Sequence, residues 1–393
     1  MLSKKTKIKI LVAAALGCVG IAAIVMFLIF EKPSDDIAQL NSKYGLVTAE
    51  SLGNSIPPRV ANLFKPDSLS ANLLDSTKPK KELIVKLAAQ NSDSQTALQN
   101  VFILSLKTKD NIENIAREYA NSPEVEYAEP NFDLEKDLSP TAATETKAVS
   151  IITDSDKKPV IVAVLDSGVD INHPDLEKRV VAGWNFLDDS ADVADANGHG
   201  THVAGIILRN STAAEILPLK ISDGSNGTLR ELVEAIKYAA DNNAQVINLS
   251  LGLKQESQVL REALDYAREK NVFVVAAAGN YRSSAKYFPA AYADVFAVSA
   301  LANDGSKLFL SNFGEWVDFS VIAQDVEAPA PDEKYAIRTG TSQAAPVVTA
   351  KIADFLSTVD SANFDTVNEF LIKNSKQISG KYLLGRQILA VDK

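Results

Sequence analysis

The stretch Asn197-Gly198-His199-Gly200-Thr201-His202-Val203-Ala204-Gly205 places a histidine between two glycines, directly before an apolar helical pattern. Asp166 ends an apolar run far upstream, and Ser342 follows Gly340-Thr341 far downstream. A serine hydroxyl attacks an amide only when a base removes its proton, and a neutral imidazole held by a carboxylate is suited to that task. Almost half of the chain separates Asp166 from Ser342, so these residues can cooperate only if a fold brings them together.

Short β-rich apolar runs alternate with helical patterns along this part of the chain. Thr228 and Glu231 form a capping box before one helix, and a second helical pattern begins near Val259. Strands that alternate with helices predict an α/β fold with a parallel sheet covered on both faces, whose active site lies at the carboxyl ends of the strands. Asp166 and Asn280 lie at such ends. The predicted strands are residues 160–165, 216–221, 246–251 and 272–278.

Each candidate residue also has a purely structural interpretation. Asp166 and Asn280 are typical turn residues. Ser342 is suited to cap the apolar helix predicted over residues 344–356, and a nucleophile there would also experience the helix dipole. His173 and His202 are expected to be structural, because a histidine in a turn or on a helix face usually meets a hydrogen bond rather than a substrate.

Several blocks in a fixed order resemble the subtilisin-like serine proteases. The resemblance covers roughly residues 157–393, and the chain order Asp, His, Ser is that of subtilisin. The matching blocks are Val164-Leu165-Asp166-Ser167-Gly168-Val169-Asp170, His199-Gly200-Thr201-His202-Val203-Ala204-Gly205, Ile247-Asn248-Leu249-Ser250-Leu251-Gly252, Ala276-Ala277-Ala278-Gly279-Asn280 and Gly340-Thr341-Ser342-Gln343-Ala344-Ala345-Pro346.

The resemblance implies a subtilisin-like fold and a serine endopeptidase acting on proteins or peptides. Asp166, His199 and Ser342 would form the catalytic triad, and the amide of Asn280 would help to form the oxyanion hole. The residues that it implies for substrate binding are Ser250, Leu251, Gly252, Ala278 and Gly279.

The sequence departs from the family pattern in three places near the predicted active site or a predicted metal site. Residues 208–214 replace a calcium-binding loop of many relatives, so we expect no metal or cofactor in the active site and leave calcium binding at that loop open. Leu253 and Tyr287 stand where either could narrow the substrate cleft. Gln343 replaces the methionine that often follows the nucleophile, which removes an oxidisable thioether.

A smaller α+β module precedes the peptidase region. Residues 82–87, 101–106 and 125–130 are predicted strands, and residues 111–119 are a predicted amphipathic helix. Residues 82–135 resemble the inhibitor-type, ferredoxin-like propeptide of subtilisins, which implies an intramolecular inhibitor that is later removed. Residues 136–156 are the predicted exposed linker and the place of autocleavage.

The N-terminus predicts a membrane location. Residues 1–9 carry four lysines, and residues 10–30 are an uncharged, mostly apolar run long enough to span a bilayer as a helix. The lysines favour the cytoplasm, which predicts a single-pass signal-anchor with an extracellular catalytic domain, on a bacterial cell surface. A cleaved secretory signal peptide is the alternative. Residues 31–81 are predicted to be a juxtamembrane spacer.

The composition is typical of a globular enzyme and argues against a nucleic-acid partner. The chain has 393 residues, of which 46% are hydrophobic, and a formal net charge of −10, which argues against nucleic acid. Cys18 is its single cysteine, so the exported part has no disulfide. We predict a self-processing zymogen of a serine endopeptidase, from which the mature domain is either released or held non-covalently. The alternative function is a catalytically silent surface binding protein with the same fold.

Overall fold

The computed structural model describes residues 35–52, 80–88, 98, 100–135, 141–144, 157–377 and 387–389. The chain divides into two compact units: a small one, Met1–Asn91 with Asn100–Pro130, and a large one, Ser92–Gln99 with Asn131–Lys393. Within the described ranges, no helix has both the length and the apolar character needed to cross a membrane. The predicted span over residues 10–30 lies outside those ranges.

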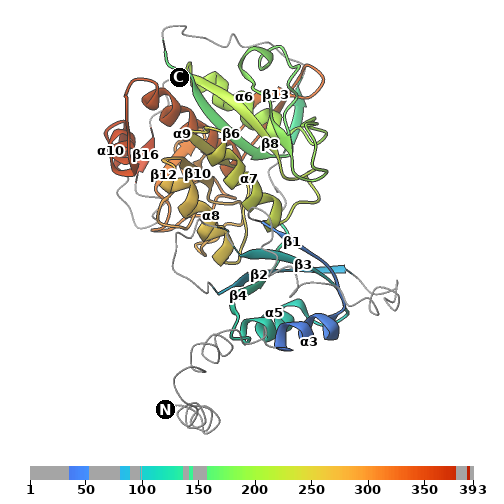
Figure 1. Cartoon of the computed structure of the whole chain (residues 1–393). Coiled ribbons are helices and arrows are strands. Elements are labelled where there is room, and N and C mark those ends of the chain that lie inside the picture. The colour runs from blue at the N-terminus through green and yellow to red at the C-terminus, as the bar shows by residue number, and fades with distance from the viewer. Residues whose placement is uncertain are drawn as a thin grey trace, which may run out of the picture. The chain divides into compact units, whose positions relative to one another are not determined.

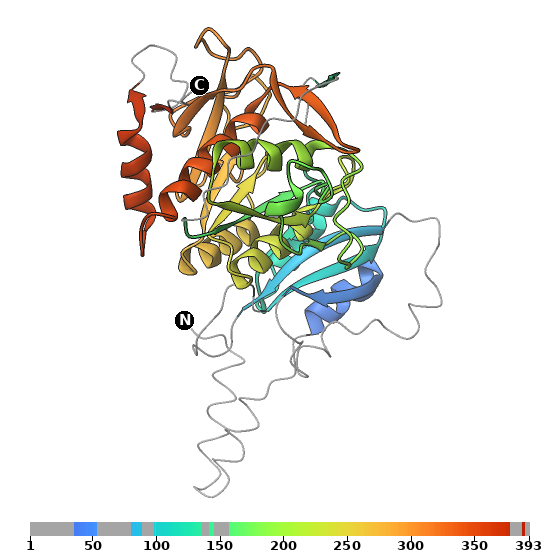
Figure 2. The same ribbon diagram turned by 90° about the horizontal axis from the view of Figure 1, so that it is seen from above.

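The small unit is a four-stranded antiparallel sheet with two helices, one strand and one helix more than its sequence pattern predicts. Its strand order is β1-β3-β2-β4, and the helices α3 and α5 pack beside each other (Figures 1 and 2). Asn111 caps α5, since its side chain accepts a hydrogen bond from the Asn114 N–H. The elements are α3 (Asp35–Tyr44), β1 (Leu46–Ser51), β2 (Lys80–Leu87), β3 (Val101–Lys107), α5 (Ile112–Ala120) and β4 (Val125–Pro130).

The small unit begins earlier in the chain than its sequence pattern indicates. Residues 35–51, which fall inside the predicted spacer 31–81, form α3 and β1. Ile37, Tyr44 and Leu46 are buried in the core of the unit, against residues such as Leu104 and Tyr119. Only part of the predicted spacer therefore precedes the folded unit.

The large unit is built on a nine-stranded sheet in which every pairing but one runs parallel, as expected from its buried apolar strands. The strand order is β15-β16-β12-β11-β10-β9-β6-β8-β7, and β15 pairs with β16 antiparallel. In the centre, β6 lies between β8 and β9, so the carboxyl ends of these strands meet at one edge. The strands are β6 (Val160–Asp166), β7 (Trp184–Asn185), β8 (Ala214–Lys220), β9 (Val246–Leu249), β10 (Phe273–Ala277), β11 (Val295–Leu301), β12 (Phe319–Ile322), β15 (Ser375–Gln377) and β16 (Gln387–Leu389).

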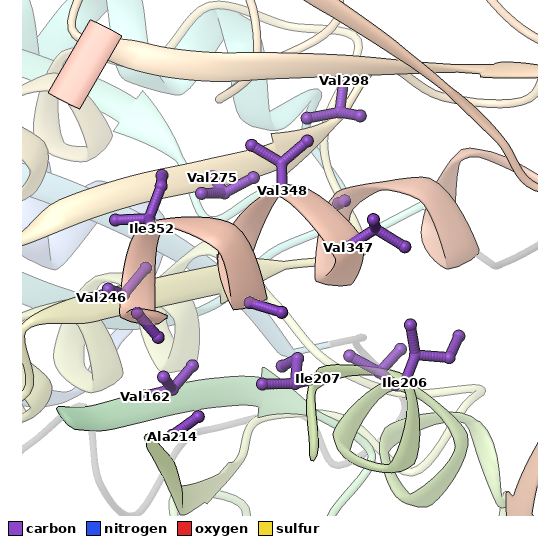
Figure 3. Close-up of a cluster of buried hydrophobic side chains, with 14 of the residues drawn as sticks. Val162, Ile206, Ile207, Ala214, Val246, Val275, Val298, Val347, Val348 and Ile352 are labelled. Carbon is purple, nitrogen blue, oxygen red and sulfur yellow. The ribbon is translucent and has the colours of Figure 1, made fainter. Parts of the chain in front are cut away.

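Helices cover the sheet in two pairs. α7 packs on α8, and α6 packs on α9, which runs along β6, β9, β10 and β11 (Figure 1). Figure 3 shows Val347, Val348 and Ile352 of α9 among apolar side chains of the strands and of α6. The helices are η1 (Glu177–Arg179), α6 (His199–Asn210), α7 (Leu229–Asp241), α8 (Gln258–Glu269), α9 (Thr341–Leu356) and α10 (Phe364–Lys373).

Part of the predicted linker joins a second, smaller sheet. β5 (Thr141–Thr144) pairs antiparallel with β14 (Lys334–Arg338), which pairs with β13 (Val326–Ala330). Thr141 and Ala142 are exposed. The described part of the predicted linker, residues 141–144, is therefore a short strand.

A buried guanidinium holds the short turn from α6 to β8, where many relatives carry the calcium loop. Arg179 is 7% exposed. It donates to the carbonyl oxygens of Leu208 at 3.2 Å, Ser211 at 2.7 Å and Ala214 at 2.7 Å. A side-chain cation therefore occupies the carbonyl oxygens of this turn.

Candidate active site

The carboxylate of Asp166 and the ring of His199 form a buried pair at the carboxyl end of β6. Asp166 is 4% exposed and His199 6%. His199 Nδ1 lies 2.8 Å from Asp166 Oδ1 and 2.9 Å from Oδ2, and the Ser167 N–H donates to Oδ1 at 2.7 Å. Because the carboxylate can only accept, the proton belongs on Nδ1, which leaves Nε2 as the basic nitrogen.

The start of α6 has to approach the loop after β6 closely for this pair to form. A Cβ atom at Gly200 would lie 2.0 Å from the Gly168 carbonyl oxygen, so only glycine fits there. Gly198, directly before the helix, has φ 83°, a left-handed conformation that also favours glycine. The glycines on both sides of His199 thus let the helix begin beside Asp166.

Asp195 is a positioning residue that the sequence pattern did not single out. It is 5% exposed and accepts hydrogen bonds from the N–H groups of Gly198 and Thr201, both at 2.8 Å. It also accepts from the hydroxyls of Ser167, at 2.8 Å, and Thr201, at 2.7 Å. An acidic residue just before a predicted helix is a known sequence signal for this role, because it satisfies the first N–H groups of the helix.

Ser342 lies in the first turn of α9, but it is not the helix cap. The N-cap is Gly340, so the predicted capping role of Ser342 is wrong. The Ser342 hydroxyl donates to the Ser250 carbonyl oxygen at 3.2 Å, and the Ser250 hydroxyl donates to the Ser342 carbonyl oxygen at 2.9 Å. This reciprocal pair fixes Ser342 beside the chain that leaves β9.

Asn280 follows β10 and is tied to the same helix. Its side-chain oxygen accepts from the Thr341 N–H at 3.0 Å and from the Thr341 hydroxyl at 3.1 Å. Since the amide is planar, its NH₂ group is directed away from Thr341. Asn312, a second asparagine that sequence patterns did not indicate, holds the same loop, because its NH₂ donates to the Ala278 carbonyl at 2.8 Å.

Two adjoining cavities of the large unit bring the predicted site residues together. Glu135, Ser250 and Leu251 line both of them. The first cavity is also lined by Gly279, Asn280, Tyr287 and Ser342. The second is also lined by Asp166, Asn197 and His199.

Two predicted substrate-binding residues lie beside the first cavity rather than in its lining. Ala277 lines it, whereas the Ala278 N–H bonds to the Val298 carbonyl oxygen. Gly252 contributes its carbonyl oxygen, which accepts from the Glu135 N–H at 3.0 Å. Gly252 therefore contacts the chain segment beside the cavity through its backbone carbonyl oxygen.

The segment Asn131–Glu135 of the large unit lies along this cleft. The Leu134 N–H donates to the Gly227 carbonyl at 2.8 Å, and the Leu229 N–H donates to the Phe132 carbonyl at 2.8 Å. Asp133 and Thr228 form an antiparallel bridge between these bonds. Together with the Glu135–Gly252 bond, they hold this segment, which contains one isolated β-bridge, between the backbone of residues 227–229 and that of Gly252. Sequence periodicity ended the predicted strand at Pro130 and missed this pairing.

The comparisons agree with this geometry. Residues 157–387 match the family model Peptidase_S8, described as the subtilase family. The chain belongs to the subtilase family. A thermophilic serine proteinase from Bacillus sp. (strain AK1) is 36% identical over 292 residues, which cover 69% of this chain and 72% of that protein. Thermitase from Thermoactinomyces vulgaris is 39% identical over 207 residues, which cover 50% and 74% of the two chains.

A solved structure supports the same assignment. The crystal structure of a cold adapted subtilisin-like serine proteinase matches with a TM-score of 0.57 and 28% identity, over 61% of this chain and 92% of that chain. This subtilase is a serine-type endopeptidase with a subtilisin-like α/β fold.

The other two histidines of the subtilase bind backbone groups, as their structural interpretation predicts. His173 Nε2 lies 3.1 Å from the Lys334 carbonyl oxygen, and its Nδ1 accepts from the Asp175 N–H at 3.2 Å. His202 Nε2 lies 3.0 Å from the Ala336 carbonyl oxygen and 3.2 Å from that of Val326. The contacts of His202 link α6 to β13 and β14, and the contact of His173 links the loop after β6 to β14.

Acid should destabilise the fold through His202. Burial, and then the positive charge of Arg338, lowers the pKa of His202 to about 3. Its buried Nδ1 has no hydrogen-bond acceptor among the described residues. The unfolded chain, with a histidine pKa of about 6.5, binds the proton more readily, so stability is lost as pH falls from about 6.5 towards 3. We expect His202 to account for about 2 kcal/mol of lost stability between pH 6.5 and 4.5.

Urea unfolding at these two pH values measures this loss. Carboxylates also contribute to acid destabilisation, so the control is His202→Gln, which keeps an N–H donor but does not titrate. The variant should lose about 2 kcal/mol less than the wild type over the same interval. Equal losses in both proteins would show that His202 is not the titrating group.

Proposed function

We propose that this subtilase is made as a membrane-anchored zymogen that processes itself, and that Asp166, His199 and Ser342 hydrolyse peptide bonds of protein substrates. One observation carries the proposal. The hydrogen-bonded Asp166–His199 pair lines one of two adjoining cavities, Ser342 and Asn280 line the other, and the chain's own segment Asn131–Glu135 is hydrogen-bonded beside them, which supports the proposal.

The proposed chemistry follows from the positions of the donors and acceptors. For attack, the Ser342 hydroxyl turns from the Ser250 carbonyl to His199 Nε2, which accepts the proton as the Oγ–C bond forms. Asp166 stabilises the imidazolium through Nδ1–H. The Asn280 NH₂ and an N–H of the first turn of α9 stabilise the oxyanion. His199 then protonates the leaving amine, and water hydrolyses the acyl-enzyme by the same proton transfers.

The zymogen proposal is supported by the paired segment. A segment held by backbone hydrogen bonds to Gly227, Leu229 and Gly252 excludes other peptides from the same backbone groups. The resemblance of residues 82–135 to an inhibitor-type propeptide makes this segment the end of an intramolecular inhibitor. Cleavage within residues 136–156 would then separate the inhibitor from the enzyme.

Self-processing should depend on the Ser342 hydroxyl. We expect the purified wild-type chain to be cut within residues 136–156, while Ser342→Ala stays full length, because the variant lacks the nucleophile. Intact-mass spectrometry measures the fragments. Ser299→Ala is the matched control, since Ser299 is also buried but hydrogen-bonds Ser320 within the sheet, and it should process normally.

A fluorophosphonate probe tests the same nucleophile independently. It should label the processed wild type and the Ser299→Ala control but not Ser342→Ala. If wild type stays full length and also fails to react with the probe, the proposed catalytic roles are wrong.

The membrane part of the proposal is tested with the unprocessed variant. Residues 10–30 would act as an uncleaved anchor, so Ser342→Ala should remain with the membranes after an alkaline carbonate wash and retain residues 1–30 by intact mass. A protein beginning at residue 31 should be soluble. A secretory signal peptide would instead give a soluble protein whose mass lacks the N-terminal segment.

Tyr287 should restrict the side chain that enters the cavity beside Ser342. It is 5% exposed and lines this cavity. A Cβ atom at Gly252 would lie 2.5 Å from its Cε1, and one at Gly279 would lie 3.0 Å from its Cδ1, so the ring closely fills the space between the two glycine backbones. We propose that the residue before the scissile bond is small.

Tyr287→Ala should open this cavity to large side chains. We expect the ratio of kcat/KM for a peptide with phenylalanine before the scissile bond to that for its alanine analogue to rise about tenfold or more. Steady-state cleavage of the two peptides measures the ratio. Tyr238→Ala, which removes a tyrosine that contacts Phe186 outside both cavities, is the control and should leave the ratio unchanged.

A further inference from the structure

The carboxylate of Glu135 is held by two side chains at the rim of the cleft. Lys254 Nζ lies 3.0 Å from Glu135 Oε2, and the Tyr281 hydroxyl donates to the same oxygen at 2.8 Å. Lys254 Nζ also lies 4.4 Å from the centroid of the Tyr281 ring, within cation–π range. A cation and a hydroxyl donor therefore converge on one carboxylate oxygen.

The backbone of Glu135 fixes where this carboxylate lies relative to the reaction. The Glu135 N–H pairs with the Gly252 carbonyl oxygen, and Ser250, two residues earlier, carries the carbonyl that accepts the Ser342 hydroxyl. Paired strands repeat every two residues. We take an extended substrate to keep this register and to run antiparallel to residues 250–252, so that the residue two positions after the Glu135 equivalent reaches Ser250 and Ser342. The carboxylate thus belongs to the third residue before the scissile bond.

We propose that Lys254 and Tyr281 form a subsite that recognises an acidic side chain, preferably glutamate, at the third residue before the scissile bond. The inference rests on the proposed function and narrows its substrates to chains with an acidic residue at that position. The chain's own Glu135 occupies the subsite in the same way.

The chemistry of the subsite distinguishes glutamate from its neutral analogue. Lys254 donates but cannot accept, and the Tyr281 hydroxyl points its proton at the bound oxygen, so both groups favour an anion. The side chains of Glu135 and Lys254 are 26% and 53% exposed, so the ion pair is partly screened by water. A hydrogen bond to a charged group adds to it, and we expect a preference of about tenfold rather than an absolute requirement.

Peptide cleavage by the processed enzyme tests the subsite. The substrates are internally quenched peptides with the sequence of residues 131–140, which carry Glu, Gln or Lys at the position of Glu135. Wild type should cleave the Glu peptide with a kcat/KM about tenfold above that for the Gln peptide, and further above that for the Lys peptide. The preference should shrink at high salt, because the ion pair is partly exposed.

Substitutions assign the preference to its two groups. Lys254→Met and Tyr281→Phe should each reduce the ratio of Glu to Gln cleavage, because each removes one of the two groups that favour the carboxylate. Lys254→Glu should favour the Lys peptide. Lys270→Met is the control: Lys270 stands near the Tyr266 ring and Asp241, a similar trio that lines neither cavity, and the ratio should not change.

The outcomes separate the two proposals. Cleavage of no peptide, together with no labelling by the fluorophosphonate probe, would reject the proposed catalytic function. Equal cleavage of the Glu and Gln peptides by an enzyme that labels normally would reject the acidic subsite alone. So would a Lys254→Met variant that keeps the full preference.

Discussion

A carboxylate buried at the edge of a parallel sheet constrains the structure around it. An ionised group in this position is costly unless hydrogen bonds satisfy it, and Asp166 obtains them from the Ser167 N–H and from His199. The bond to His199 requires α6 to begin beside β6, which the glycine at Gly200 permits. Because α6 then packs its apolar side on α9, the position of Asp166 also sets the position of the helix that carries Ser342.

Two sets of hydrogen bonds connect the turn that carries Ser342 to the central sheet. Ser250, after β9, exchanges hydrogen bonds with Ser342, and Asn280, after β10, accepts two hydrogen bonds from Thr341. Both links join the carboxyl end of a central strand to the first turn of α9. Groups held in this way need little rearrangement when charge develops during acyl transfer, which is the condition for effective electrostatic stabilisation. At the opposite end of α6, the buried guanidinium of Arg179 closes the turn to β8 by donating to three carbonyl oxygens.

Sequence patterns predicted the features that depend on local periodicity. The strand β6, which ends at Asp166, and the capping box of α7 with Thr228 and Glu231 both follow from such patterns. Features that depend on long-range partners were missed. The sequence of β1, Leu46–Ser51, lacks the clear alternation of apolar and polar residues that predicts a strand. It forms a strand because it pairs with the edge of β3. Asp195 and Asn312 resemble ordinary loop residues until their backbone partners are known. The cap of α9 was misplaced because a serine before an apolar run fits the N-cap pattern, whereas Gly340 occupies that position.

In the proposed zymogen, the inhibitory segment and the substrate compete for the same backbone groups, those of residues 227–229 and of Gly252. The inhibitory segment wins this competition as long as it is covalently connected to the enzyme. Backbone pairing and a partly exposed ion pair at Glu135 give an isolated peptide only modest affinity. A segment connected to the enzyme competes at an effective concentration of the order of millimolar, so modest contacts are enough to fill the cleft. Cutting the connection removes this advantage without changing any contact. In the proposed zymogen, weak recognition of Glu135 by Lys254 and Tyr281 is therefore an advantage, because tighter contacts would keep the cleft closed after cleavage.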